Sequence, residues 1–377
     1  MAETQSRDNR TTTVRDRVLQ ALGQVIDPEI RKPITQLDMV GSVEVDAAGH
    51  ASVHVKLTIV GCPAAERIER DVTHAVLDTD GVTGATITVG AMTPAERAEL
   101  TVKLRGAAAR GNPFGPGTAT RVITVTSGKG GVGKSTITAN LAVALAARGL
   151  QVGLLDADVH GFSIPGLLGL VTPDGTAQRP TRVDDMILPP VAHGVKTISI
   201  GMFLDGPAAV SWRGPMLHRT INQFLTDVFF GDLDVLLLDL PPGTGDVAIS
   251  VGQLLPNAEV IVVTTPQPAA ADVAERSALV ARQTGQHVYG VIENMAGLAQ
   301  PDGTVLELFG AGGGAEVALR LSTDQPEPVP LLASVPLSVA LREGGDAGEP
   351  VVLCSPDDPA AGAIQAVADR LAAELGR

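Results

Sequence analysis

Short runs of aliphatic residues alternate with stretches of helical spacing from residue 121 onward. Most positions within each run are hydrophobic, without a period-two alternation, which is typical of strands buried on both faces. Their alternation with helices predicts an α/β fold with a doubly wound parallel sheet. We expect its strands at 122–126, 152–155, 195–200, 235–238, 260–263 and 288–292.

The first hundred residues follow a different pattern, in which segments with hydrophobic residues at helical spacing alternate with segments where they recur at every second position. Two alternating runs flank Ala48-Gly49, which predicts a β-hairpin. We expect a small α+β domain over residues 1–105, with helices at 12–25, 64–78 and 94–104 and strands at 43–46, 51–57 and 85–89. Residues 106–120 are rich in Gly, Ala, Pro and Asn and predict a linker, which leaves 121–377 for the second domain.

Charge and cysteine content narrow the class of protein. The net charge of −14 argues against broad binding to nucleic acid or to anionic lipid. Only Cys62 and Cys354 carry sulfhydryl groups, so no disulfide framework is expected and a reducing compartment is favoured. The first residues lack the apolar core of a signal peptide, and no later run is long enough to span a bilayer. We therefore expect a cytoplasmic protein without nucleic-acid or membrane partners.

The segment after the first aliphatic run has the pattern of a Walker A loop. It leads into a helix at Thr136 and reads Gly128-Lys129-Gly130-Gly131-Val132-Gly133-Lys134-Ser135. Its glycines let successive backbone amides converge on phosphate oxygens, and the helix N-terminus adds a partial positive charge. Lys134 is expected to bind the β- and γ-phosphates, and Ser135 to hold Mg²⁺ through its hydroxyl. The sequence therefore predicts ATP and Mg²⁺ as ligands, with every residue from Gly128 to Thr136 in the nucleotide site.

Carboxylates follow two further strands. Asp156 and Asp158 come directly after the second strand, and Asp239 ends a hydrophobic strand as in a Walker B motif. Asp239 is expected to bind Mg²⁺ through water, while Asp156 supports either the Mg²⁺ shell or the loop. The glycine-rich stretch after Asp239 places Gly243 where its amide can sense the γ-phosphate. ATP hydrolysis also requires a group that holds water in line with that phosphate.

A second lysine at the start of the loop resembles the deviant Walker A motif of ParA/MinD-like ATPases. That resemblance implies that Lys129 reaches the nucleotide of a partner subunit, so that the active form is a homodimer enclosing two ATP molecules. It also implies that Asp158 orients the attacking water and that Asn294 pairs with the adenine edge. Lys129, Lys134 and Asp158 are therefore the expected catalytic residues.

Taken together, the motifs resemble the Mrp/ApbC family of iron-sulfur cluster carrier ATPases. The resemblance rests on the loop above and on Asp156-Ala157-Asp158-Val159-His160-Gly161, Trp212-Arg213-Gly214-Pro215, Asp239-Leu240-Pro241-Pro242-Gly243-Thr244-Gly245-Asp246 and Glu293-Asn294-Met295. The first domain, with Asp27-Pro28-Glu29 and Thr58-Ile59-Val60-Gly61-Cys62-Pro63, resembles the iron-sulfur-assembly domain often fused in front of that ATPase. The family implies that clusters are delivered to apoproteins.

One position departs from the family pattern. Most members carry a Cys-x-x-Cys pair shortly after the residue corresponding to Asn294, where a two-fold dimer would hold one [4Fe-4S] cluster through four thiolates. Here Gln300 and Asp302 occupy that stretch, and neither is a usual cluster ligand. The remaining sulfur donors are Cys62, expected at the start of a helix whose dipole lowers a thiol pKa, and Cys354, expected in the core. Cys62 is thus either a cluster ligand or a small buried hydrophobic residue.

Two other functions remain compatible with these residues. A ParA/MinD-like dimer would use ATP to switch the binding of a protein partner, without any cluster. Such relatives need a basic surface or an amphipathic membrane helix, and the acidic, alanine-rich segment 359–375 offers neither. A small-molecule synthetase or kinase of the P-loop class would need a substrate pocket, which no sequence motif here indicates.

Overall fold

The computed structural model describes residues 13–105, 111–159, 161–204, 214–300, 302–323 and 325–376. The chain divides into two compact units. The first consists of Met1–Ala108 and Thr181–Leu188, and the second of Ala109–Pro180 and Pro189–Arg377.

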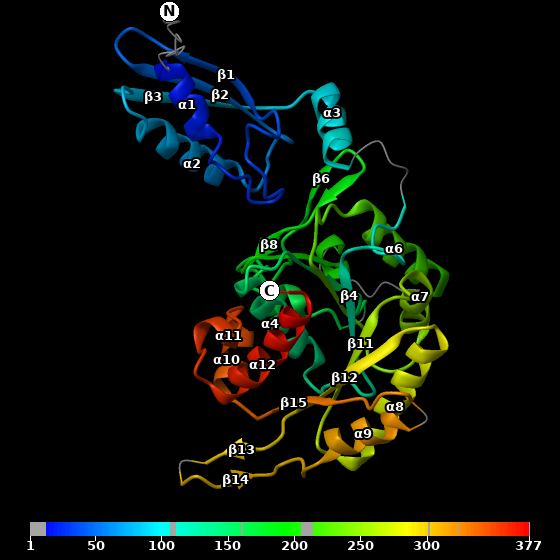
Figure 1. Ribbon diagram of the computed structural model, residues 1–377. Helices are drawn as coiled ribbons and strands as arrows, with labels where there is room; N and C mark the ends of the chain where they lie inside the picture. The colour runs from blue at the N-terminus through cyan, green and yellow to red at the C-terminus, as the bar shows by residue number, and fades with distance from the viewer. Residues whose placement is uncertain are drawn as a thin grey trace, which may run out of the picture. The chain divides into compact units, whose positions relative to one another are not determined.

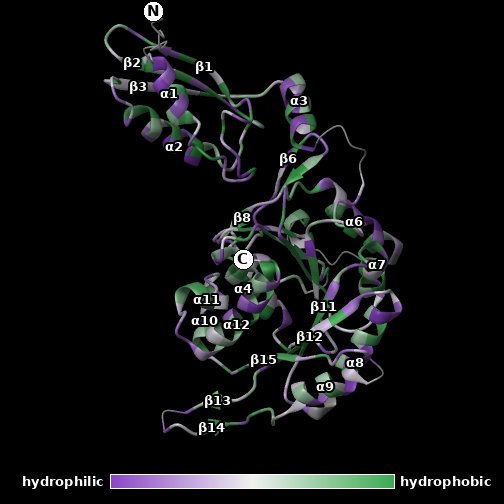
Figure 2. Ribbon diagram, in the orientation of Figure 1, coloured by the Kyte–Doolittle hydropathy of each residue, from purple (hydrophilic) through white to green (hydrophobic). Residues whose placement is uncertain are grey.

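The first unit has the predicted α+β order. Strands β1 and β2 pair antiparallel across the turn at Gly49, whose φ of 85° is readily adopted only without a Cβ, and β3 pairs parallel to β2. Helices α1, α2 and α3 carry both hydrophobic and hydrophilic residues, as Figure 2 shows. The elements are α1 (Val14–Leu22), β1 (Val40–Val45), β2 (His50–Leu57), α2 (Ala65–Leu77), β3 (Gly84–Ala91) and α3 (Pro94–Arg105).

A hairpin from the later part of the chain also belongs to the first unit. It is formed by β6 (Thr181–Val183) and β7 (Met186–Leu188), which pair antiparallel. Val183, Met186 and Leu188 are fully buried. The predicted boundary, with all of 121–377 in the second domain, therefore differs from the structure at this hairpin. Its two short strands carry no pattern that separates them from the surrounding loops.

The second unit is built on a sheet whose order, within the described residues, is β15-β12-β11-β4-β10-β5-β9-β8. All neighbours pair parallel except β8, which runs antiparallel to β9. The parallel sheet predicted from the aliphatic runs is therefore confirmed. The strands are β4 (Arg121–Ser127), β5 (Val152–Asp156), β8 (Val191–Ala192), β9 (Val195–Ser199), β10 (Val235–Asp239), β11 (Glu259–Thr264), β12 (His287–Asn294) and β15 (Leu331–Val335).

Helices cover both faces of this sheet (Figure 1). One layer contains α4, α10, α11 and α12, and the other contains α6, α7, α8 and α9. No helix in the described part of the chain is long and apolar enough to cross a membrane. The helices are α4 (Lys134–Ala147), α5 (Ile164–Leu167), η1 (Ile200–Phe203), α6 (Gly214–Asp227), α7 (Asp246–Leu254), α8 (Pro268–Gln283), α9 (Gly313–Ser322), α10 (Val339–Ala347), α11 (Val351–Cys354) and α12 (Pro359–Glu374).

The described part of the predicted linker is packed rather than free. Phe114 is 3% exposed, and its ring meets the ring of Phe230 edge-on at 5.8 Å. The side chain of Asn112 donates to the carbonyl of Leu254 at 3.0 Å. The Gly- and Pro-rich composition predicts a loop correctly, but one aromatic residue anchors that loop to the second unit. Residues 106–110 of the predicted linker lie outside the described residues.

Candidate functional site

The phosphate loop connects the end of β4 to the start of α4. Gly133 caps α4 with a φ of 78°, a left-handed conformation that favours glycine. Gly128 passes so close to α8 that a Cβ there would lie 2.4 Å from the backbone nitrogen of Ala274. These glycines let the loop turn tightly into the N-terminus of α4, where backbone amides can bind phosphate oxygens.

Three side chains from α4 contact the carboxylate of Asp239. Lys134 Nζ lies 2.7 Å and Ser135 Oγ 2.6 Å from Asp239 Oδ2, and Thr138 Oγ1 donates to Oδ1 at 2.9 Å. Lys134 is 6% exposed and Asp239 is fully buried. The predicted Walker A and Walker B residues thus meet directly. Thr138, one helical turn after Lys134, belongs to the same cluster and was missed, because nothing in the motif marks it.

Asp156 lies beside Asp239, since the two residues are Cα partners on neighbouring strands. Its carboxylate accepts hydrogen bonds from Ser199 Oγ at 3.0 Å and from the amide of Asp158 at 3.1 Å. Asp158 in turn accepts from the amide of Gly161 at 2.9 Å. Asp156 is therefore hydrogen-bonded to the start of the loop that carries Asp158.

Burial and mutual repulsion make this edge of the sheet electrostatically unusual. Burial, together with the adjacent charge of Asp239, raises the pKa of Asp156. Burial also raises the pKa of Asp239, while the charge and hydrogen bond of Lys134 act against that rise. One buried ammonium thus faces two buried carboxylates. A divalent cation would supply the missing positive charge, and the hydroxyl of Ser135 with the carboxylate of Asp239 are oxygen ligands of the kind that Mg²⁺ prefers.

Residues of the phosphate loop line two neighbouring cavities. One of about 580 Å³ is lined by the loop residues from Ser127 to Thr136 except Gly128, and by Asp158 and Pro242 among others. The second, of about 480 Å³, is lined by Asn294, Met295 and apolar residues such as Leu308. Gly133 and Thr136 border both. The first has room and donors for phosphates, and the second has the apolar walls suited to a base.

Three further residues predicted for the nucleotide site are Asn294, Gly243 and Lys129. Asn294 is 4% exposed, and its side-chain nitrogen donates to the carbonyl of Val132 at 2.9 Å. The amide of Gly243 donates to the carbonyl of Ser127 at 2.8 Å, so it is engaged within the protein. Lys129 is half-buried and lines the larger cavity. His160, Trp212 and Arg213 of the sequence motifs lie outside the described residues.

Comparison with known proteins places this site in a family. A model of the NUBPL iron-transfer P-loop NTPases matches residues 118–372, and a model of iron-sulfur cluster assembly proteins matches residues 15–89. The chain is 55% identical over 353 residues, 93% of its length, to 91% of an iron-sulfur cluster carrier protein from Mycobacterium tuberculosis. It belongs to the Mrp/ApbC family of iron-sulfur cluster carrier proteins.

Other family members and one solved structure agree with this assignment. An iron-sulfur cluster carrier protein from Synechocystis is 39% identical over 362 residues, covering 96% of this chain and 97% of the relative. A nucleotide-binding protein from Archaeoglobus fulgidus, solved in complex with ADP, is 38% identical with a TM-score of 0.52. It covers 60% of this chain and 86% of its own length. The predicted family, the fold and the P-loop NTPase class are therefore confirmed.

The stretch where most Mrp/ApbC members carry paired cysteines forms a small hairpin here, from β13 (Leu298–Ala299) to β14 (Val305–Leu306). Gln300 accepts the amide of Gly303 through its carbonyl, and Asp302 accepts both the amide and the hydroxyl of Thr304. These residues shape a turn and offer no thiolate. Among the described residues, no group of three or more His, Cys, Asp or Glu side chains is arranged to hold a metal ion.

The two cysteines differ from the expectations. Cys354 is exposed, with its Sγ 3.3 Å from the carbonyl oxygen of Glu349, so its predicted place in the core is wrong. The short helix α11 turns this residue outward while it buries Val351 and Val352. Cys62 is buried just before α2, but burial and the charge of Glu29 raise the pKa of its thiol to about 11. The predicted lowering by the helix dipole is therefore outweighed.

Glu29 is the buried partner of Cys62 in the first unit. The thiol of Cys62 donates to Glu29 Oε2 at 3.8 Å, and Thr181 Oγ1 of the β6–β7 hairpin donates to Oε1 at 2.5 Å. Burial is the main cause that raises the pKa of Glu29 from 4.5 to about 7. The motif Asp27-Pro28-Glu29 is visible in the sequence. The contact of Glu29 with Cys62 is not, because the two residues are 33 positions apart.

A pH dependence of stability follows from Glu29. Because its folded-state pKa of about 7 lies above the ordinary value of 4.5, the native protein keeps a proton that the unfolded chain releases between these values. Stability of the first unit should therefore fall as pH rises from 4.5 to 7, by up to about 3 kcal/mol. Glu29→Gln should flatten this slope. Hydrogen exchange of amides in β2 of the whole protein, from pH 5 to 8, would measure it, and equal slopes in both proteins would contradict the assignment.

Proposed function

We propose that the chain hydrolyses ATP and uses this cycle to deliver iron-sulfur clusters to apoproteins. The observation that carries the ATPase half is the cluster of Lys134, Ser135 and Asp239 beneath the loop, with Asp158 on the same cavity. Membership of the carrier family supports the cargo.

Each residue has a distinct role in this proposal. Lys134 leaves Asp239 to bind the β- and γ-phosphates, which replace the carboxylate as its anionic partner. Ser135 and Asp239 would hold Mg²⁺, which neutralises phosphate charge when it is bound. Asp158 orients the attacking water, and its hydrogen bond from Gly161 fixes the carboxylate at the edge of the phosphate cavity.

In this proposal Gly243 senses the γ-phosphate through its amide, and Asn294 pairs with the adenine edge. A γ-phosphate oxygen would compete with the carbonyl of Ser127 for the amide of Gly243, so ATP but not ADP can pull the segment after β10 away from β4. Asn294 already donates to the loop at Val132, which places its side chain between the phosphate loop and the cavity proposed for the base.

The active form is proposed to be a homodimer that encloses two ATP molecules. Lys129 lines the phosphate cavity, and among the described residues it has no ion pair closer than 4.0 Å. A half-buried ammonium in that position is available to nucleotide phosphates, including those of a second subunit.

The dimer gives a prediction for Lys129→Ala. ATP with Mg²⁺ should drive the wild-type protein to a dimer, and the variant should weaken dimerisation by at least about tenfold, because one buried phosphate contact is lost at each site. Nucleotide binding by one subunit should change less. Light scattering with a slowly hydrolysed ATP analogue measures the mass. If the measured mass does not depend on nucleotide and is the same in the variant, the homodimer that encloses two ATP molecules is refuted.

Cluster binding is proposed to depend on Cys62. Gln300 and Asp302 hold iron poorly, so a cluster needs the thiols that remain or those of a partner. We expect Cys62→Ser to abolish iron-sulfur binding and to leave ATP turnover near the wild-type rate, since the substitution lies in the other unit. Anaerobic reconstitution with absorption spectroscopy and iron and sulfide counting tests this. Cys354→Ser is the matched control, and full cluster loading of Cys62→Ser would place the site elsewhere.

A second function is favoured by the missing thiols at 297–303. In it the chain is an ATP-switched dimer that recruits a protein partner and never holds a cluster. The same reconstitution separates the two, because this alternative expects no cluster absorbance even in the wild-type protein.

A further inference from the structure

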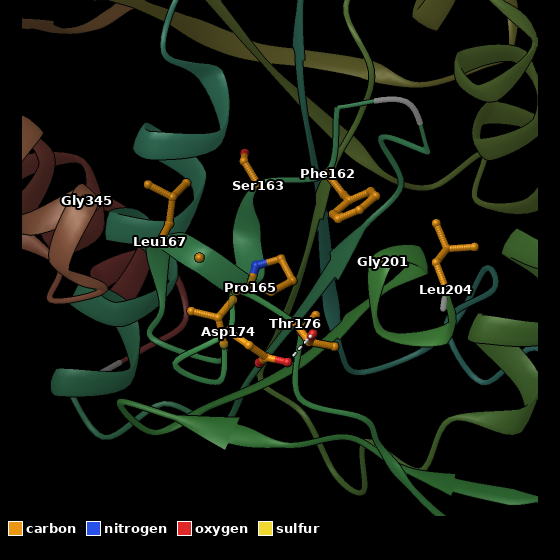
Figure 3. Close-up of a pocket in the computed structure, with 13 residues that line it drawn as sticks. Phe162, Ser163, Pro165, Leu167, Asp174, Thr176, Gly201, Leu204 and Gly345 are labelled. Carbon is orange, nitrogen blue, oxygen red and sulfur yellow. Dashed lines mark hydrogen bonds between the residues drawn. The ribbon is translucent and has the colours of Figure 1, made fainter. Parts of the chain in front are cut away.

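A third cavity, of about 560 Å³, lies in the second unit beside the nucleotide site. Its walls are mainly apolar, and Figure 3 shows Pro165 between Leu167 and Phe162, with Leu204 on the far side of Phe162. Phe162 is 38% exposed and Val171 is 41% exposed. Apolar groups this accessible usually mark a binding surface when they line a hollow rather than stand alone.

This cavity borders both halves of the nucleotide site. Ser163 also lines the phosphate cavity, and Leu167 and Gly345 also line the cavity proposed for the base. Phe162 follows Gly161, whose amide donates to Asp158. An occupant that contacts Phe162 would therefore touch the loop that carries the proposed water-orienting residue.

Within the described part of the chain, the carboxylate of Asp174 is the one charged group that lines the cavity. It lies on an exposed turn that is closed by the bridge between Val171 and Ala177. The hydroxyls of Thr172 and Thr176 both donate to Asp174, the latter at 3.2 Å, as the dashed line in Figure 3 shows. The carboxylate is thus held in place at an apolar site, where it can pair with a cation.

The cavity also contains open space at a defined backbone position. A Cβ built on Gly166 in α5 would meet no atom within 4 Å. Since Gly166 lines the cavity and has helical backbone geometry, we expect a side chain there to occupy part of the open space without backbone strain. The space is therefore accessible to a group brought by another molecule.

We propose that this cavity takes an apolar side chain of a protein partner, with a neighbouring basic residue paired to Asp174. Charge complementarity favours a basic segment, because Asp174 is the one charged side chain among the described residues that line the cavity, and the whole chain carries −14. The exposed mouth suits a side chain whose backbone stays outside. Binding itself needs no ATP; only its effect on Asp158 rests on the proposed function.

Short peptides of defined sequence test this. The probe is an acetylated and amidated Gly-Phe-Arg-Gly carrying a photoreactive phenylalanine analogue, and the comparison peptides replace Arg with Glu or the aromatic residue with Ala. At low salt the Phe-Arg peptide should bind at least about fivefold more tightly than the Phe-Glu peptide. Its crosslinks, located by mass spectrometry, should fall within 161–177 and 200–204. Equal binding of all peptides, or crosslinks elsewhere, would overturn the proposal.

Two variants sharpen the test. Gly166→Leu should fill the cavity and reduce crosslinking at least about fivefold, as expected when a steric plug removes a pocket. Gly362→Leu is the matched control, because Gly362 is also a helical glycine with open space at its Cβ, in α12 and outside this cavity. Asp174→Asn should remove the preference for Arg over Glu even if Gly166→Leu folds poorly. Wild-type selectivity in Asp174→Asn would overturn the charge pairing.

The assay also separates this inference from the proposed function. It is run without nucleotide, so a failure to bind peptide rejects the docking site and leaves the ATPase assignment intact. If Lys134→Ala loses ATP turnover but binds the peptide as the wild type does, peptide binding does not depend on ATPase activity. If a small apolar amine binds in this cavity but no peptide crosslinks there, the cavity serves a small molecule and the protein-partner proposal is wrong.

Discussion

Lys134→Ala should reduce ATP turnover by at least about 100-fold and greatly weaken nucleotide binding, because it removes the ammonium that contacts the transferred phosphate. The structure adds a second expected effect. Lys134 is the cation that faces the buried Asp239, so its loss leaves that carboxylate with the hydroxyls of Ser135 and Thr138 alone. Unfolding free energy should therefore fall by about 3 kcal/mol as well.

A double variant separates these two effects. In Lys134→Ala with Asp239→Asn, the uncompensated charge is gone, so most of the lost stability should return while turnover stays absent. Thermal unfolding and phosphate release would be measured on the wild type, both single variants and the double variant. Wild-type turnover in Lys134→Ala would refute the site. Recovery of turnover together with stability would show that the lysine acts only as a structural partner of Asp239.

The nucleotide site could be predicted from the sequence because its signals are local. Gly128 to Ser135 lie in one unbroken segment, and the strand before it and the helix after it are each marked by hydrophobic pattern. Asp156 and Asp239 were found for a related reason. In a parallel sheet the residues that end neighbouring strands meet at one edge, and the structure pairs these two across β5 and β10.

What the sequence could not predict depends on contacts between distant segments. In the sequence nothing distinguishes Thr181 from other threonines. Its hydrogen bond to Glu29, 152 positions away, appears only in the folded structure. The raised pKa of the Cys62 thiol also needs that fold, because the burial of Cys62 and the charge of Glu29 together outweigh a local helix effect. Cys354 follows three aliphatic residues, and the hydrophobic pattern does not show where the short α11 ends its buried face.

The cavity beside Phe162 escaped prediction for a different reason. Its lining comes from the loop after β5, from α5, from the turn at Asp174, from the segment after β9 and from α10, and the motif in the loop after β5 ends at Gly161, before the first lining residue. Loops shape such a hollow through backbone paths that hydrophobic periodicity does not describe. Glycines contribute as well, since Gly166 leaves open space where most residues would fill it.

Asp158→Asn should have the opposite signature to Lys134→Ala, because it should slow hydrolysis while it spares nucleotide binding. The proposed role needs the negative charge of the carboxylate to orient water, whereas the hydrogen bond from Gly161 needs only an oxygen acceptor, which asparagine keeps. The loop geometry should therefore survive. We expect the hydrolysis rate to fall by about 100-fold or more, with ATP affinity within about threefold of wild type.

Asp156→Asn is the matched comparison for that variant. Each substitution removes one carboxylate, but Asp156 ends β5, is fully buried and is bonded to Ser199 and to the amide of Asp158, so its replacement should act on loop geometry. Single-turnover hydrolysis and equilibrium binding of a fluorescent ATP analogue would be measured for both. Equal loss of binding and hydrolysis in Asp158→Asn would make Asp158 a binding residue. A normal hydrolysis rate would remove it from the catalytic step, and the water would then need another group on the phosphate cavity.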